Sequence, residues 1–119
     1  MKKSSYSKNI SLCIITKNRE HLLMLCLESI KKQSIHPNEI IIIDSSNTMI
    51  CTPFEDKHIK YFYAPLLNIP AARNKAITLT SEELIMFVDD DYLLSSNAIE
   101  VIQKHFITFP QTKILFGLS

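Results

Sequence analysis

Two runs of apolar residues without polar alternation, Ile40–Ile43 and Leu84–Val88, constrain the fold of this chain most strongly. A strand with one solvated face alternates apolar and polar residues, whereas an unbroken apolar run is typical of a strand buried on both faces. Such strands occur in parallel sheets that carry helices on either side. The two runs therefore predict a parallel sheet at the centre of an α/β domain.

The rest of the chain alternates between expected strands and expected helices. The first helix has apolar residues at the i, i+3, i+4, i+7 spacing of a helix with one buried face. A helix that connects two parallel strands almost always makes a right-handed crossover. The alternating order therefore predicts a three-layer α/β/α fold with a mainly parallel sheet. Further strands are expected over 11–16, 59–63 and 113–118, and helices over about 20–33, from Pro70 onward and over about 97–107.

Three consecutive acids, Asp89, Asp90 and Asp91, follow the second apolar run directly. Two carboxylates about 4 Å apart repel by roughly 4 kcal/mol at an effective dielectric constant near 20, so a cation is expected among them. Open α/β sheets bind ligands beyond the carboxyl ends of their strands. The triplet therefore predicts a site for a hard divalent cation that holds phosphate oxygens. The alternative is a solvated acidic turn.

Polar side chains also follow the other strands at the same expected edge. Thr16 ends the first strand, Asp44 ends the second, and Arg73 lies near the amino end of the helix that begins at Pro70. Arginine is suited to bidentate phosphate contact, and carboxylates accept hydrogen bonds from ribose hydroxyls or a base N–H. Together they predict a site for a diphosphate with a bridging metal. Each residue also has a structural interpretation: Thr16 ends a strand, Asp44 caps the Ser45–Ser46 turn, and Arg73 is solvated.

Glycine is nearly absent, since Gly117 is the only one in the chain. The dinucleotide-binding fingerprint and the P-loop both need several glycines that this sequence lacks. A bound nucleotide must therefore be held by side chains, ordinary backbone amides and metal rather than by a glycine-rich loop.

Charge and cysteine content narrow the setting of the chain. Thirteen basic and twelve acidic residues leave a net charge of +1, which excludes a global field that would recruit nucleic acid. No segment approaches the roughly 20 apolar residues that span a bilayer. Cys13, Cys26 and Cys51 lack metal-ligand spacing and are expected to be reduced. A cytoplasmic location is therefore expected, and attachment to the inner face of the membrane stays open. Residues 1–10 are expected to be a disordered or extended lead-in.

Four short segments resemble motifs of the family 2 glycosyltransferases, which are inverting, nucleotide-sugar-dependent enzymes of the GT-A fold. The segments are Ile14–Arg19, Asp44, Ala71–Asn74 and the Asp89-x-Asp91 pair. Their order, spacing and placement on the expected elements agree over roughly residues 11 to 118. The resemblance therefore implies a GT-A type α/β fold that binds a nucleoside-diphosphate sugar, with a UDP type donor favoured.

The resemblance implies a role for each matched residue. Thr16 and Asp44 would contact the nucleobase, and Arg73 would reach the base or the diphosphate. Asp89 would hold the ribose, and Asp91 would bind the Mn²⁺ or Mg²⁺ that bridges the diphosphate. Such a metal would offset the charge that builds on the leaving nucleoside diphosphate.

Other positions carry weaker expectations or depart from the family. Asp90 lies between the two matched aspartates and would have a supporting role, while Arg19 is expected to be a solvated helix residue. Ser45–Ser46 replaces a segment in which the family commonly has another acid or amide and a glycine. Leu67–Pro70 replaces a loop that usually contains glycine.

The resemblance further implies that the chain holds only part of an enzyme. In the family, the acceptor-binding half and the general base lie beyond the donor-binding half, and here only one helix and one strand are expected after Asp91. Residues 11–119 are thus expected to be an incomplete donor-binding domain with little or no transfer activity alone. An uncovered terminal strand over 113–118 would favour self-association.

Two further functions stay open at this point. Asp89-x-Asp91 is also similar to the nucleophile motif of haloacid-dehalogenase-like phosphatases, although Leu93 stands where that motif has threonine or valine. Alternatively, the chain is a non-catalytic α/β module whose acids bind a metal or nucleotide, or whose surface binds a partner.

Overall fold

The computed structural model describes residues 10–50, 54, 56–82, 84–91, 93–108 and 114–115. The expected lead-in before residue 10, Cys51 and most of the expected strand 113–118 lie outside these residues. None of the described helices is both long enough and apolar enough to cross a membrane.

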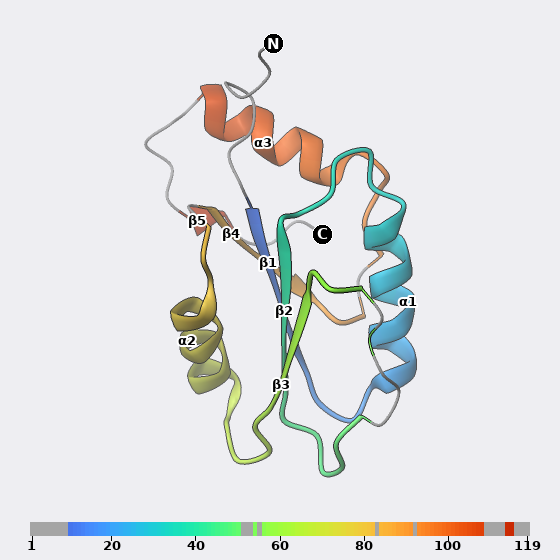
Figure 1. Ribbon diagram of the computed structural model, residues 1–119, viewed down its shortest axis with the longest axis vertical. Coiled ribbons are helices and arrows are strands. Elements are labelled where there is room, and N and C mark those ends of the chain that lie inside the picture. Colours follow the sequence, from blue (N-terminus) through green and yellow to red (C-terminus); the bar gives the residue numbers. More distant parts are fainter. Residues whose placement is uncertain are drawn as a thin grey trace.

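A parallel sheet forms the centre of the fold, as expected from the two apolar runs. Its strands all run in the same direction, and the expected strand at 113–118 is described over Ile114–Leu115 (Figure 1). The order across the sheet is β3 (Ile59–Tyr63), β2 (Glu39–Asp44), β1 (Ile10–Thr16), β4 (Leu84–Asp89) and β5 (Ile114–Leu115).

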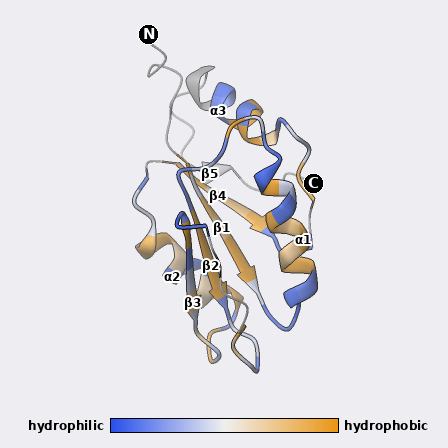
Figure 2. Ribbon diagram, turned by 45° about the vertical axis from the view of Figure 1, so that its right-hand side comes forward, coloured by the Kyte–Doolittle hydropathy of each residue, from blue (hydrophilic) through white to orange (hydrophobic). Residues whose placement is uncertain are grey.

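Helices cover both faces of this sheet, which confirms the three-layer α/β/α prediction. Helices α1 (Glu20–Lys31) and α3 (Ala98–Thr108) pack on one face, and α2 (Ile69–Leu79) packs on the other (Figure 1). Figure 2 shows that strands β1, β2 and β4 between these layers are hydrophobic along most of their length. Ala72 and Ala76 are fully buried against the sheet, because their small side chains let α2 approach it closely.

The register of the strands brings their polar ends to one edge. Thr16 at the end of β1 is the partner of Asp44 at the end of β2, and Ile15 is the partner of Asp89 at the end of β4. Parallel strands that share this register must leave the sheet side by side. The polar residues that follow them therefore meet at the carboxyl edge.

Two local features place the helices that flank this edge. Asn68 caps α2 by accepting a hydrogen bond from the Ala71 backbone N–H at 2.9 Å, and Pro70 fits the first turn, where no N–H is needed. Asn18 adopts a φ of 56°, which asparagine tolerates better than most residues, and so turns the chain from β1 into α1. As a result, Arg73 and Arg19 lie near the amino ends of two helices at the same edge.

The described cysteines belong to the core. Cys13 and Cys26 are both fully buried and reduced, and burial raises the pKa of each thiol to about 12. Thiols that stay protonated at neutral pH are poor nucleophiles and poor metal ligands. Their expected role as small buried side chains is confirmed.

The buried Glu39 carboxylate stabilises the amino edge of the sheet. Glu39 is 3% exposed and accepts hydrogen bonds from the Ser11 hydroxyl and from the Ser81 backbone N–H at 2.7 Å. Its other oxygen pairs with the Lys60 ammonium at 2.7 Å. Burial alone would raise the pKa of Glu39, but these donors outweigh burial and lower the pKa to about 2.

Replacing Glu39 with glutamine is expected to lower the free energy of unfolding by about 2 kcal/mol at pH 7. The folded pKa lies below the usual 4.5, so this contribution is complete above pH 4.5 and is lost as the pH falls through about 2. Urea unfolding at several pH values should show the gap between the two proteins closing over that window. The E82Q variant is the matched control, and a gap for E39Q that is unchanged at pH 2 would contradict the assignment.

Candidate functional site

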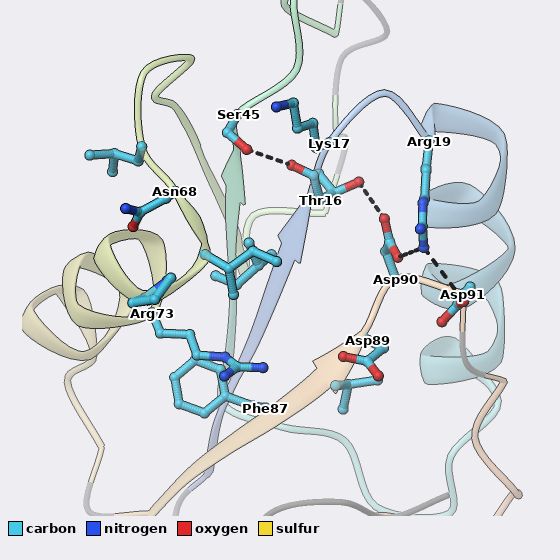
Figure 3. A pocket seen from close by; sticks show the side chains of 15 residues that line it. Thr16, Lys17, Arg19, Ser45, Asn68, Arg73, Phe87, Asp89, Asp90 and Asp91 are labelled. Atoms are coloured by element: carbon cyan, nitrogen blue, oxygen red, sulfur yellow. Dashed lines mark hydrogen bonds and ion pairs between the residues drawn. The ribbon is translucent and has the colours of Figure 1, made fainter.

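The carboxyl edge of the sheet carries a pocket of about 740 Å³. Figure 3 shows it between the carboxyl ends of β1 and β4, with α2 on one side and the turn into α1 on the other. Its lining consists of Ile15, Thr16, Lys17, Arg19, Ser45, Leu67, Asn68, Ile69, Pro70, Arg73, Phe87, Val88, Asp89, Asp90 and Asp91. A volume of this size is in the range of small-molecule sites.

Four of the five residues predicted for the site line this pocket. They are Thr16, Arg73, Asp89 and Asp91, and they come from β1, from α2 and from the end of β4. Figure 3 shows Arg73 on the wall that faces the three aspartates. The structure thus brings together a cation and several oxygens that are distant in sequence. The roles given to these residues stay predictions.

Asp90 is the buried member of the acidic triplet. It is 5% exposed, its Oδ2 accepts a hydrogen bond from the Thr16 hydroxyl at 2.8 Å, and its Oδ1 pairs with the Arg19 guanidinium at 3.1 Å. Both oxygens are thus engaged by neighbouring side chains. The Asp90 carboxylate supports the floor of the pocket, while Asp89 and Asp91 are exposed at its surface.

Arg19 forms ion pairs with Asp90 and Asp91, so the expectation of a solvated helix residue was wrong. Its Nη1 group lies 3.1 Å from Asp90 and 3.5 Å from Asp91. Sequence reasoning missed this pair because the partners are more than 70 positions apart. The parallel pairing of β1 with β4 supplies the proximity, and the basic residue directly before the first helix was the only signal in the sequence.

Asp44 behaves differently from the other predicted residues. It is fully buried and does not line the pocket. Its Oδ1 accepts hydrogen bonds from the Ser46 backbone N–H at 2.9 Å and from the Ser46 hydroxyl, and its Oδ2 accepts one from the Tyr61 hydroxyl. The next residue, Ser45, reaches the pocket instead. The proposed nucleobase contact of Asp44 therefore requires the Tyr61 side chain to move.

Removing the Tyr61 hydroxyl with the Y61F variant is expected to lower the free energy of unfolding by about 1.5 kcal/mol. The hydroxyl donates to Asp44 and accepts from the Ile50 backbone N–H at 3.0 Å, so both groups would lose a partner. Thermal or urea unfolding measures the change. Y63F is the matched control, because the Tyr63 hydroxyl donates only to main-chain carbonyls near the surface. Equal stability of Y61F and the unmodified chain would contradict the buried network.

The residues at the pocket fit a divalent cation that takes most of its coordinating oxygens from a bound phosphate compound and only a few from the protein. Asp89 and Asp91 offer exposed carboxylate oxygens, which are the donors that Mg²⁺ and Mn²⁺ prefer. Within the described part of the chain, no three histidine, cysteine, aspartate or glutamate side chains form a preformed metal cluster. Mg²⁺ typically binds through one or two carboxylates plus substrate phosphates, so a complete protein cage is not needed.

The charges around the pocket are balanced. Lys17, Arg19 and Arg73 supply three positive groups, and the triplet supplies three negative ones. Arg19 and Asp90 neutralise each other through a close contact. This leaves two acids that could face a divalent cation and two cations that could face a diphosphate. The pocket is therefore electrostatically suited to a metal–diphosphate pair.

Comparison with solved structures identifies the fold. The chain superimposes on TarS from S. aureus with a TM-score of 0.65 and 20% sequence identity, covering 82% of this chain and 19% of that one. A structure of TarS residues 1–349 in complex with UDP gives a TM-score of 0.64 at 20% identity, with 82% and 32% covered. These likenesses confirm a fold of the TarS type, the GT-A fold that the sequence led us to expect.

Sequence relatives agree with the fold. The uncharacterized glycosyltransferase YwdF of Bacillus subtilis is 32% identical over 109 residues, which cover 83% of this chain and 38% of YwdF. Glycosyltransferase GlyA of Streptococcus pneumoniae is 28% identical over 91% of this chain and 16% of its own length. The chain thus spans well under half the length of these relatives. Residues 11–112 match the family described as "Glycosyl transferase family 2", and the chain belongs to that family.

Proposed function

We propose that this chain is the donor-binding part of a family 2 glycosyltransferase, which binds a nucleoside-diphosphate sugar with Mn²⁺ or Mg²⁺ for inverting transfer. The observation that carries this proposal is the pocket at the carboxyl edge, with Arg73 facing Asp89 and Asp91. Its support comes from the family match and from TarS, a fold neighbour whose structure contains UDP. We favour a UDP type donor on this basis.

Arg73 is the group best placed to bind the diphosphate. It is exposed and it lines the pocket. Its guanidinium can donate two parallel hydrogen bonds to phosphate oxygens. Asp91 would hold the divalent cation, which when bound would offset negative charge on the leaving nucleoside diphosphate. Asp89 would accept hydrogen bonds from the ribose hydroxyls.

The base end of the donor is assigned to the ends of β1 and β2. Thr16 is 2% exposed, its hydroxyl donates to Asp90, and its carbonyl accepts from the Ser45 backbone N–H at 3.0 Å. Its part of the contact is therefore left to its methyl group and to the acceptor capacity of its hydroxyl oxygen. Ser45 adds a buried polar side chain to the pocket lining beside it, and its hydroxyl donates to the Thr16 carbonyl at 3.5 Å. Asp44 contributes directly only if the Tyr61 hydrogen bond opens. Base recognition here therefore combines Thr16 and Asp44 with Ser45.

We assign residues 11–119 to the donor-binding part and residues 1–10 to a short lead-in. No side chain of the chain is assigned as the general base, and we expect transfer activity to need further protein beyond the donor-binding part. Family membership sets aside the phosphatase alternative. A non-catalytic binding module is the remaining alternative, and it would share the same ligand. Self-association through the strand at 113–118 and a cytoplasmic location stay predictions.

Isothermal titration of the chain with UDP, GDP and ADP, each with and without Mn²⁺, tests this function. We expect UDP to bind most tightly and Mn²⁺ to tighten its binding about 100-fold, because the metal neutralises the diphosphate beside the acids. Failure of all three nucleotides to bind in the presence of Mn²⁺ would refute the proposal.

A further inference from the structure

Arg19 and the expected metal compete for the same carboxylate. Asp91 is the residue proposed to hold the divalent cation, and its Oδ2 lies 3.5 Å from Nη1 of Arg19. Arg19 is the N-cap residue of α1, yet its side chain makes no capping hydrogen bond and instead crosses to the end of β4. A permanent positive charge therefore already lies where a second cation is expected.

The two contacts of Arg19 differ in strength. The contact to Asp90 is 3.1 Å long, and the Asp90 carboxylate is buried and fixed by the Thr16 hydroxyl. The contact to Asp91 is at the upper limit of a hydrogen bond, and the Asp91 side chain is 53% exposed, so water screens the pair. Asp91 can thus leave Arg19 while Arg19 stays bound to Asp90.

The backbone before Arg19 is held independently of any cation. The Asn18 backbone N–H donates to the Ser46 hydroxyl at 2.6 Å, and the Asn18 side chain accepts from the Asn47 backbone N–H at 3.0 Å. These two bonds fix the left-handed turn at Asn18, which directs the chain toward the acids. The position of Arg19 is therefore built into the fold before a ligand arrives.

Arg19 also keeps capacity for a ligand while it contacts the acids. Both contacts use the same Nη1 group, and a guanidinium has five N–H donors in all. Arg19 is half exposed and lines the pocket. It can therefore face a diphosphate while it remains paired with Asp90.

We propose that Arg19 is a positioning residue that occupies Asp91 when no divalent cation is bound and releases Asp91 when metal and nucleoside diphosphate bind together. This inference rests on the proposed function and adds a reason why metal and nucleotide would bind cooperatively. Metal alone meets the positive charge of Arg19 and binds weakly. A diphosphate attracts that charge toward itself, so nucleotide and metal strengthen each other's binding.

The test is the affinity for Mn²⁺ without nucleotide, measured from the electron paramagnetic resonance signal of free Mn²⁺. The R19Q variant should bind Mn²⁺ about tenfold more tightly than the unmodified chain, because one repelling charge is removed. R19K keeps the charge and should stay within about threefold. K31Q removes a positive charge from the far end of α1 and should stay within about twofold, because Lys31 pairs with Glu28 near solvent.

The UDP arm of the experiment separates the two proposals. UDP should tighten Mn²⁺ binding in the unmodified chain by a larger factor than in R19Q. R19Q that binds Mn²⁺ equally or more weakly, with a circular dichroism spectrum like that of the unmodified chain, would overturn the inference. Absence of UDP binding to every variant would refute the proposed function, while the affinity for Mn²⁺ alone would still decide the role of Arg19.

Discussion

Replacing Arg73 with alanine is expected to weaken UDP binding about 100-fold, which corresponds to about 2.7 kcal/mol. Arg73 faces the acids across the pocket and is the cation best placed for the diphosphate. Hydrogen bonds to charged groups contribute about 1.5–3 kcal/mol each, and a bidentate contact to phosphate is at the upper end of that range. Isothermal titration in the presence of Mn²⁺ measures the loss.

Lys75 provides the matched control for this substitution. It lies two positions further along α2, is exposed, and does not line the pocket. K75A removes the same charge from the same helix, so the long-range field of the domain changes equally in both variants. UDP affinity that falls by the same factor in K75A and R73A would show that only overall charge matters, and would contradict a direct contact of Arg73.

Replacing Asp91 with asparagine is expected to weaken UDP binding by up to about 100-fold when Mn²⁺ is present, since it removes a metal-binding carboxylate and with it the roughly 100-fold gain that the metal provides. Without Mn²⁺ the direction should reverse, because D91N removes a negative charge that repels the diphosphate. Titration of UDP with and without Mn²⁺ separates these two effects. The sign reversal distinguishes loss of a metal ligand from general damage to the pocket.

E28Q is a suitable control for D91N, because Glu28 is an exposed carboxylate on α1 that pairs with Lys31 outside the pocket. Its UDP affinity should be unchanged in both conditions. If D91N lowers UDP affinity equally with and without Mn²⁺, Asp91 does not act through a metal, and the assignment of the cation site is wrong.

The architecture could be predicted from the sequence because each element carried its own local signal. The apolar runs 40–43 and 84–88 identified β2 and β4, and the spacing of Leu23, Cys26, Leu27 and Ile30 identified the buried face of α1. Parallel pairing then followed from the alternation of strands and helices. The pocket could be placed at the carboxyl edge for the same reason, since parallel strands end together.

The side-chain contacts at the carboxyl edge could not be predicted, because they depend on side chains that meet only after folding. Tyr61 lies on the edge strand β3, and nothing in its sequence neighbourhood indicates that its hydroxyl binds Asp44. The Arg19–Asp90 pair likewise joins the turn after β1 to the end of β4. Periodicity reports which face of an element is buried, whereas the partner of a buried polar group is set by tertiary packing.

Metal and nucleotide are proposed to bind together at the carboxyl edge of the sheet. Paramagnetic broadening by Mn²⁺ in the two-dimensional amide NMR spectrum of the isotope-labelled chain with UDP tests it most directly. We predict that broadening centres on the amides of residues 16–19 and 89–91. Broadening centred on the smaller pocket of about 310 Å³ at the amino edge, near His36, Asp56 and His58, would contradict the claim.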